Sequence, residues 1–235
     1  MRLLLISNST NAGEKFLEHP KEHIKNFLGD VSSALFLPYA AVTSSLDQYE
    51  QEIKDYFSQF NIKIESLHHH KRNHKHAVKQ AEAIIVGGGN TFKLLKTIQQ
   101  LDIIETLRFK VLEGVPYVGW SAGANVACPT ICTTNDMPIV EPDNFSAFNL
   151  VRFQINPHYL DANPDGHAGE TRQERIEEFI NMDPYSYVVG LREGSILHIE
   201  DGDIKLLGNK PARIFKFEEE QRECNPGDNL DFLFE

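Results

Sequence analysis

The sequence predicts an α/β fold built on a mostly parallel sheet, and three observations support that prediction. Short, continuously apolar segments recur through the first half of the chain, separated by longer segments whose apolar residues have helical spacing. Of the 235 residues, 41% are hydrophobic, which is enough to fill a sizeable core. Near the C-terminus, short strand-like runs follow one another closely, as in antiparallel pairing. We therefore expect three layers, with helices on both faces of the sheet and antiparallel strands at the C-terminal end.

The first half of the chain alternates expected strands with expected helices. Ser45 and Gln48 have the spacing of a capping box at the start of one helix, and Pro20 fits the first position of an earlier one. The expected strands are Leu3–Ile6, Ala34–Leu37, Ile62–Leu67, Ala83–Val86 and Val115–Val118. The expected helices begin near Pro20, Ser45 and Thr91, and a further one spans about Ile103–Leu112.

In the second half of the chain, an alternating strand is expected at Val151–Ile155, and Asn156-Pro157 should end it. A helix over Thr171–Asn181 and a strand over Tyr187–Leu191 follow. Three short antiparallel strands are then expected at Ile196–Ile199, Ile204–Leu207 and Arg213–Phe217, with Asp201-Gly202 as a hairpin turn. Neither a flexible linker nor an internal repeat interrupts the chain, so we expect one domain over residues 1–235.

Composition restricts the partners. The formal net charge is −11, from 34 acidic and 23 basic residues, which argues against nucleic acid or an anionic membrane surface as a partner. No apolar stretch is long enough to span a bilayer, and the first one is too short for a signal peptide. Three cysteines without a CxxC pair indicate reduced thiols, so we expect a cytoplasmic protein.

The most informative motif is Gly119-Trp120-Ser121-Ala122-Gly123, which reads G-x-S-x-G between an apolar strand and a helix-compatible segment. This is the context of a nucleophile elbow, in which a sharp turn lifts the serine hydroxyl clear of the sheet. A glycine- and serine-rich turn without chemistry fits the five residues equally well.

A serine nucleophile needs an imidazole to take its proton, and ten histidines compete for that role. Five of them lie in the basic run 68–76, which we expect to be a solvated loop or the start of a helix. No cysteine or carboxylate accompanies that run at ligand spacing, so no metal is expected. His158 follows a strand, at the edge of the sheet where sites form, and is favoured. His167, in the same loop region, is the alternative.

The imidazole in turn needs a carboxylate to fix its tautomer. Asp136 lies in the segment between the elbow and the strand before His158, and Glu193 follows the strand Tyr187–Leu191. Either carboxylate is a candidate, and both fit equally well as ordinary surface residues.

An oxyanion hole needs backbone donors near the serine. The amide of Ala122 follows the nucleophile directly, and Gly87-Gly88-Gly89 offers further amides without side chains, of which we assign Gly88 and Gly89. A phosphate-binding loop is the rival interpretation. The loop lacks the GxGxxG and GK[ST] patterns, so we expect no nucleotide cofactor.

Together these segments resemble the peptidase E family of α-aspartyl dipeptidases. The similarity runs from the first strand to about Gly194, with motif order and spacing both matching. The segments that carry it are Leu4–Thr10, Gly87–Phe92, Gly119–Asn125, Thr133–Ile139, Gln154–His158, Gly166-His167 and Gly169–Arg172.

The resemblance implies a class I glutamine amidotransferase-like, flavodoxin-like fold and a serine peptidase without a cofactor. Ser121 is then the nucleophile and His158 the base. The family's third member matches either Asp136, preferred for its distinctive flanking motif, or Glu193. The implied substrate is a small acidic dipeptide with an N-terminal aspartate.

A guanidinium at Arg172 would bind the substrate's β-carboxylate, and Asn90 would help to orient the substrate. Two other functions stay open: a cyanophycinase-like hydrolase of another aspartyl substrate, or a ligand-binding domain that has lost the chemistry. The sequence leaves the oligomeric state open, a homodimer included.

Overall fold

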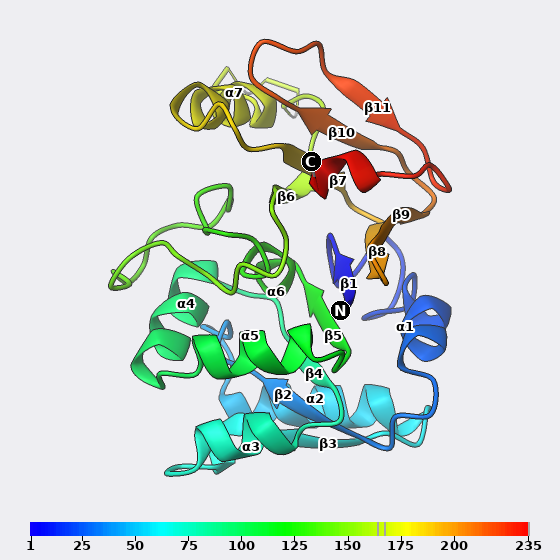
Figure 1. Cartoon of the computed structure of the whole chain (residues 1–235), viewed down its shortest axis with the longest axis vertical. Coiled ribbons are helices and arrows are strands. Elements are labelled where there is room, and N and C mark those ends of the chain that lie inside the picture. Colours follow the sequence, from blue (N-terminus) through cyan, green and yellow to red (C-terminus); the bar gives the residue numbers. More distant parts are fainter. Residues whose placement is uncertain (164, 167, 235) are drawn as a thin grey trace.

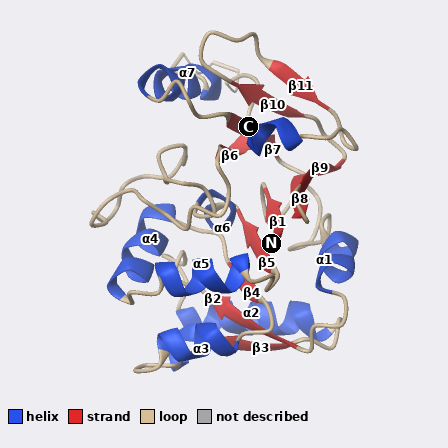
Figure 2. Ribbon diagram, in the orientation of Figure 1, coloured by secondary structure: helices blue, strands red, loops and turns tan. Residues whose placement is uncertain are grey.

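The computed structural model describes residues 1–163, 165, 166 and 168–234. Two sheets organise the chain, and Figure 1 shows the large one with its helices below the smaller one, which carries the C-terminal part of the chain. Figure 2 shows long loops on one side, between the two sheets. Within the described residues, no helix is long and apolar enough to cross a membrane.

The large sheet has seven strands in the order β3-β2-β4-β5-β1-β8-β9. The first five in this order are parallel, and β8 and β9 add an antiparallel hairpin beside β1. Their bounds are β1 Arg2–Ile6, β2 Ser33–Leu37, β3 Lys63–Ser66, β4 Ile84–Val86, β5 Tyr117–Trp120, β8 Ser195–Glu200 and β9 Asp203–Gly208. The carboxyl ends of β4 and β5 therefore meet at one edge of the sheet.

Helices cover both faces of this sheet, as predicted. On one face, α1 and α2 bury Ile24 and Ile53 against strand residues such as Phe36. On the other, α3, α4 and α5 pack through residues such as Val78, Leu94 and Leu107. The bounds are α1 Lys21–Leu28, α2 Leu46–Ser58, α3 His74–Gln80, α4 Thr91–Gln100, α5 Ile104–Leu112 and α6 Ala122–Asn125, with the 3-10 helix η1 at Leu67–His69. The capping box of Ser45 and Gln48 is confirmed at the start of α2.

The smaller sheet has the order β11-β10-β7-β6, and helix α7 (Arg172–Met182) packs on it through Ile176 and Ile180. Strands β6 and β7 are parallel, whereas β10 and β11 are antiparallel to their neighbours. The bounds are β6 Gln154–Tyr159, β7 Val188–Arg192, β10 Ala212–Phe215 and β11 Arg222–Cys224, and a last 3-10 helix, η2, spans Asp231–Phe234.

One predicted strand boundary is wrong. The expected strand Val151–Ile155 was to stop at Asn156-Pro157, but β6 continues through both residues to Tyr159. Proline is tolerated because the β6–β7 register shifts between Pro157 and Tyr159, so the ladder is irregular there. His158 consequently sits in this irregularity, inside the strand, rather than beyond its end.

Candidate active site

The Gly119–Gly123 turn is a strained elbow between β5 and α6. Ser121 has φ 53° and ψ −112°, a backbone conformation that a residue with a side chain rarely adopts. Close packing holds it: a Cβ on Gly119 would lie 2.4 Å from the carbonyl oxygen of Gly123, and one on Gly123 would lie 2.2 Å from that of Val86. The two glycines thus allow the turn to pack tightly enough to present the Ser121 hydroxyl.

His158 reaches that hydroxyl from the smaller sheet. Its Nε2 lies 3.0 Å from Ser121 Oγ, within hydrogen-bond distance. The backbone of His158 also has a positive φ, 53°, at the register shift of β6. The strand irregularity therefore aims the ring of His158 at the elbow on the large sheet.

Glu193 lies on the other side of the same ring, with Oε1 2.7 Å from His158 Nδ1. Since a carboxylate oxygen only accepts, Nδ1 carries the proton, and in the neutral ring the Nε2 lone pair faces the serine hydroxyl. This is the arrangement that lets an imidazole remove the serine proton. The structure thus corrects the preference for Asp136: the carboxylate in contact with His158 is Glu193.

Asp136 instead holds the start of α4. Its Oδ2 accepts hydrogen bonds from the amide of Thr91 at 2.7 Å and from the Thr91 hydroxyl at 2.6 Å. Thr134 adds a hydrogen bond of 3.0 Å to that hydroxyl. A carboxylate at a helix N-terminus satisfies otherwise unpaired amides, so Asp136 fixes the helix that follows the glycine loop.

The glycine loop lies directly beside the elbow. A Cβ on Gly88 would be 3.1 Å from Ser121 Cβ, and Gly89 has φ 135° with its α-carbon packed against the backbone of Ala40. Within the described chain, the amides of Gly88, Gly89 and Ala122 donate no hydrogen bond, whereas that of Gly87 does. These three amides are therefore free to bind an oxyanion.

Asn90 has its polar atoms engaged in holding this loop. Its Oδ1 caps α4 by accepting from the amide of Lys93 at 3.0 Å, and its Nδ2 donates to the carbonyl of Met137 at 2.8 Å. One N–H and one lone pair remain for a substrate.

Arg172, the first residue of α7, is half-buried. Burial lowers the pKa of its guanidinium, the neighbouring Arg175 lowers it further, and the negative charge of Asp136 raises it. The guanidinium forms no ion pair with a described residue. The guanidinium of Arg172 is thus close enough to the carboxylate of Asp136 for the two charges to interact.

Two buried polar residues after β1 were not among the predicted site residues. Ser7 Oγ accepts from the amide of His158 at 2.9 Å and donates to the carbonyl of Leu191 at 2.7 Å. Asn8 Oδ1 accepts from the amide of Gly194 at 2.8 Å, next to Glu193. Their position at the carboxyl end of a buried parallel strand was a signal that the sequence offered.

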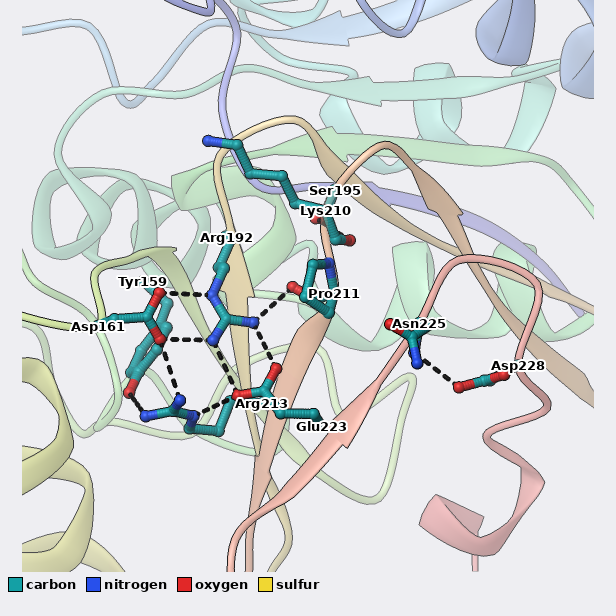
Figure 3. Close-up of polar contacts among 10 residues, drawn as sticks. All are labelled: Tyr159, Asp161, Arg192, Ser195, Lys210, Pro211, Arg213, Glu223, Asn225 and Asp228. Atoms are coloured by element: carbon teal, nitrogen blue, oxygen red, sulfur yellow. Dashed lines mark hydrogen bonds and ion pairs between the residues drawn. The ribbon is translucent and has the colours of Figure 1, made fainter.

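Figure 3 shows an ion-pair network around Arg192, the residue that precedes Glu193. Arg192 donates to both carboxylate oxygens of Asp161 and of Glu223 and stacks over the ring of Tyr159. Arg213 pairs with the same two carboxylates. Asp161 follows β6 and Arg192 ends β7, so the network ties the loop after His158 to the strand before Glu193.

The second candidate base, His167, lies outside the described residues. Only one group of histidine and acidic side chains in the described chain is compact enough to hold a metal ion: Asp47, Glu50, His68 and His69. This group lies where η1 follows β3. Strands β2 and β4 separate β3 from β5, the strand that leads to Ser121, so the group is not part of the Ser121 site.

Comparisons with known proteins show which family and which fold this chain is similar to. The family model "Peptidase family S51" matches residues 3–207. The chain is 51% identical to "Peptidase E" of Nostoc sp., over 100% of this chain and 97% of that protein. It is 44% identical to "Peptidase E" of Salmonella paratyphi A, over 94% of this chain and 96% of that protein. Its fold is similar to that of a crystallised peptidase from an acI-B1 Actinobacterium, with a TM-score of 0.73 and 17% sequence identity. The match covers 97% of this chain and 96% of that one.

Proposed function

Since the chain belongs to peptidase family S51, we propose that it is a serine dipeptidase that removes an N-terminal aspartate from small peptides. The proposal rests on three side chains in contact with one another. His158 Nε2 lies 3.0 Å from Ser121 Oγ, and His158 Nδ1 lies 2.7 Å from Glu193 Oε1. A serine in a strained elbow, an imidazole with a defined tautomer and a carboxylate behind it constitute the machinery of acyl transfer.

In the proposed reaction, Ser121 Oγ attacks the aspartyl carbonyl carbon while His158 Nε2 takes the hydroxyl proton. The negative charge that forms on the carbonyl oxygen is held by the amides of Gly88, Gly89 and Ala122. Glu193 stabilises the resulting imidazolium, which then protonates the leaving amine. Water hydrolyses the acyl-enzyme by the same proton transfers in reverse.

Specificity for aspartate rests on Arg172. The protein's net charge of −11 repels an acidic dipeptide, so the attraction has to be local. A half-buried guanidinium without an ion-pair partner among the described residues provides it, because it can bind the β-carboxylate with two parallel hydrogen bonds. We propose a cytoplasmic location, because three cysteines without a disulfide bond are typical of a reducing compartment.

The proposal is tested by hydrolysis of Asp-Leu, Asn-Leu, Glu-Leu, iso-Asp-Leu and N-acetyl-Asp-Leu. Asn-Leu matches Asp-Leu in shape and lacks only the charge, and the acetylated peptide lacks only the free amine. We expect Asp-Leu to be cleaved fastest, and Ser121→Ala to reduce kcat by about 10⁴-fold or more without changing the melting temperature greatly. Substantial turnover by Ser121→Ala would refute the nucleophile, and equal cleavage of Asn-Leu would refute the specificity.

A further inference from the structure

The histidine run that the proposed function leaves unused comes together with two carboxylates from another part of the chain. His68 and His69 lie in η1, and Asp47 and Glu50 lie in the first turns of α2. The ligand atoms of these four side chains all lie within 4.8 Å of one another. Two imidazole nitrogens and two carboxylate oxygens thus converge on one point.

Each imidazole hydrogen-bonds directly to one carboxylate and lies farther from the other. His68 Nε2 lies 2.9 Å from Asp47 Oδ1 and 4.0 Å from Glu50 Oε2. His69 Nε2 lies 3.8 Å from Asp47 Oδ1 and 2.6 Å from Glu50 Oε2. A tetrahedral ion with bonds of 2.0–2.1 Å needs ligand atoms about 3.3–3.4 Å apart. The four observed distances lie on both sides of that value, so sub-ångström to ångström shifts of the side chains complete the site.

The surrounding residues prepare His68 for metal binding. The buried hydroxyl of Ser66 lies 2.6 Å from His68 Nδ1, and it can either donate to that nitrogen or accept from it. An ion bound at Nε2 requires the ring proton on Nδ1, and Ser66 Oγ is positioned to accept it there. A hydrogen bond to the second ring nitrogen is the usual support of a histidine ligand.

The two carboxylates differ in a way that suits an accessible site. Glu50 has a side chain only 6% exposed, and Lys54 occupies its Oε1 at 2.8 Å, which leaves Oε2 as a single ligand atom. Asp47 is 78% exposed and free to close over an ion that enters from solvent. One fixed and one mobile carboxylate give a site with an entry path.

We propose that Asp47, Glu50, His68 and His69 bind one divalent transition-metal ion, with Zn²⁺ as the representative. Imidazole ligands favour zinc, cobalt, nickel and copper over Mg²⁺ and Ca²⁺, which take oxygen ligands. The ion links the start of α2 to η1, two segments about twenty residues apart in the sequence.

The test uses protein without a purification tag, first treated with a chelator and then titrated with Zn²⁺ in a calorimeter and by equilibrium dialysis. We expect about one equivalent to bind at this site and the melting temperature to rise with added Zn²⁺. His68→Ala/His69→Ala should lose that equivalent, whereas the matched control His74→Ala/His76→Ala, from the same run, should keep it. Co²⁺ should give the visible absorption of a four-coordinate ion in the wild type and in the control but not in His68→Ala/His69→Ala, and Mg²⁺ should not bind.

Comparison of the two double variants separates this site from zinc held elsewhere, such as at His158. If the double variant folds poorly, Asp47→Asn removes one exposed ligand and should weaken Zn²⁺ binding by about tenfold or more. Peptidase activity of Ser121 reports the fold of each variant independently. The proposal would be overturned if the wild-type protein did not bind Zn²⁺, or if the wild type, Asp47→Asn and His68→Ala/His69→Ala bound it equally. Neither result would affect the peptidase assignment.

Discussion

The hydroxyl of Ser7 accepts a hydrogen bond of 2.9 Å from the amide of His158, although 151 residues separate the two. The buried residue Ser7 directly follows β1 of the large sheet, and His158 belongs to β6 of the smaller sheet. The same hydroxyl donates to the carbonyl of Leu191, two residues before Glu193. A single side chain therefore fixes the unusual backbone of His158 relative to its carboxylate partner.

Ser7→Ala should consequently impair both stability and catalysis. It leaves a buried amide and a buried carbonyl without a partner, which costs about 1–3 kcal/mol of unfolding free energy. Because His158 then has a looser backbone, kcat should fall by about tenfold or more, while KM changes little. Chemical denaturation and steady-state kinetics check this, with the exposed Ser44→Ala as the control. A Ser7→Ala enzyme with unchanged kcat would show that Ser7 has only a structural role.

Substitution of the two carboxylates should distinguish their roles. Glu193→Gln keeps the shape but removes the acceptor charge behind His158, so kcat should fall by about 10²–10⁴-fold. Asp136→Asn can retain an acceptor for Thr91, so kcat should change by less than about tenfold and the melting temperature should fall modestly. Steady-state kinetics of the two variants, measured side by side, test which carboxylate supports His158. A greater loss in Asp136→Asn would return the third position to Asp136.

Gly88→Ala should damage the oxyanion site. Its added methyl group would lie 2.9 Å from Trp120 Cδ1 and 3.1 Å from Ser121 Cβ, so the loop has to move away from the elbow. Displacement of an oxyanion donor should reduce kcat by about 10²–10³-fold. Gly114→Ala is the control: its methyl group meets open space at φ 105°, so it should lower the melting temperature and leave kcat intact. Equal kcat values for the two variants would exclude the loop from catalysis.

Arg172→Ala should remove the preference for aspartate. We expect kcat/KM for Asp-Leu to fall by about 10²-fold and that for Asn-Leu to change little, because only the charged side chain loses its partner. Arg172→Lys should keep part of the preference, since an ammonium supplies the charge without the planar pair of donors. Arg175→Ala, an exposed arginine one turn along α7, is the matched control. An unchanged Asp-to-Asn ratio in Arg172→Ala would contradict the assignment.

Glu223→Gln should reveal a pH-dependent contribution to stability. Hydrogen bonds from Arg192 are the main cause that lowers the pKa of the Glu223 carboxyl in the folded protein. A carboxyl with a lowered folded-state pKa stabilises the protein fully above its unfolded pKa of about 4.3, and loses this effect as the pH falls through the folded-state pKa. The wild type should therefore exceed Glu223→Gln by about 1 kcal/mol in unfolding free energy between pH 6 and 8, after allowance for solvent screening.

The difference should shrink as the pH falls below the unfolded-state pKa of about 4.3 and through the lower folded-state pKa, because the protonated carboxyl then resembles glutamine. Urea denaturation across this range measures it. A difference that stays the same from pH 7 to pH 3 would exclude a contribution from the charge of Glu223.

Local sequence patterns predicted the large sheet well because the information lies within each segment. Apolar runs of strand length and amphipathic segments of helix length identified its parallel strands and covering helices. The smaller sheet was not predicted as a separate sheet, since its partners, from β6 to β11, are far apart in the chain. The end of β6 was misplaced because a register shift accommodates Pro157, and a register depends on the neighbouring strand.

The sequence by itself predicted the elbow around Ser121 and the glycine loop, because each is a local motif whose residue types limit the backbone, and it favoured His158 as the base with His167 as the alternative. Only the tertiary structure decided that Glu193 and not Asp136 contacts His158, and that Asp47 and Glu50 lie beside His68 and His69. These choices depend on which strand ends and helix turns meet in space. Hydrogen bonds and metal coordination act over about 2–3 Å, and no pattern within one segment specifies such a distance to another.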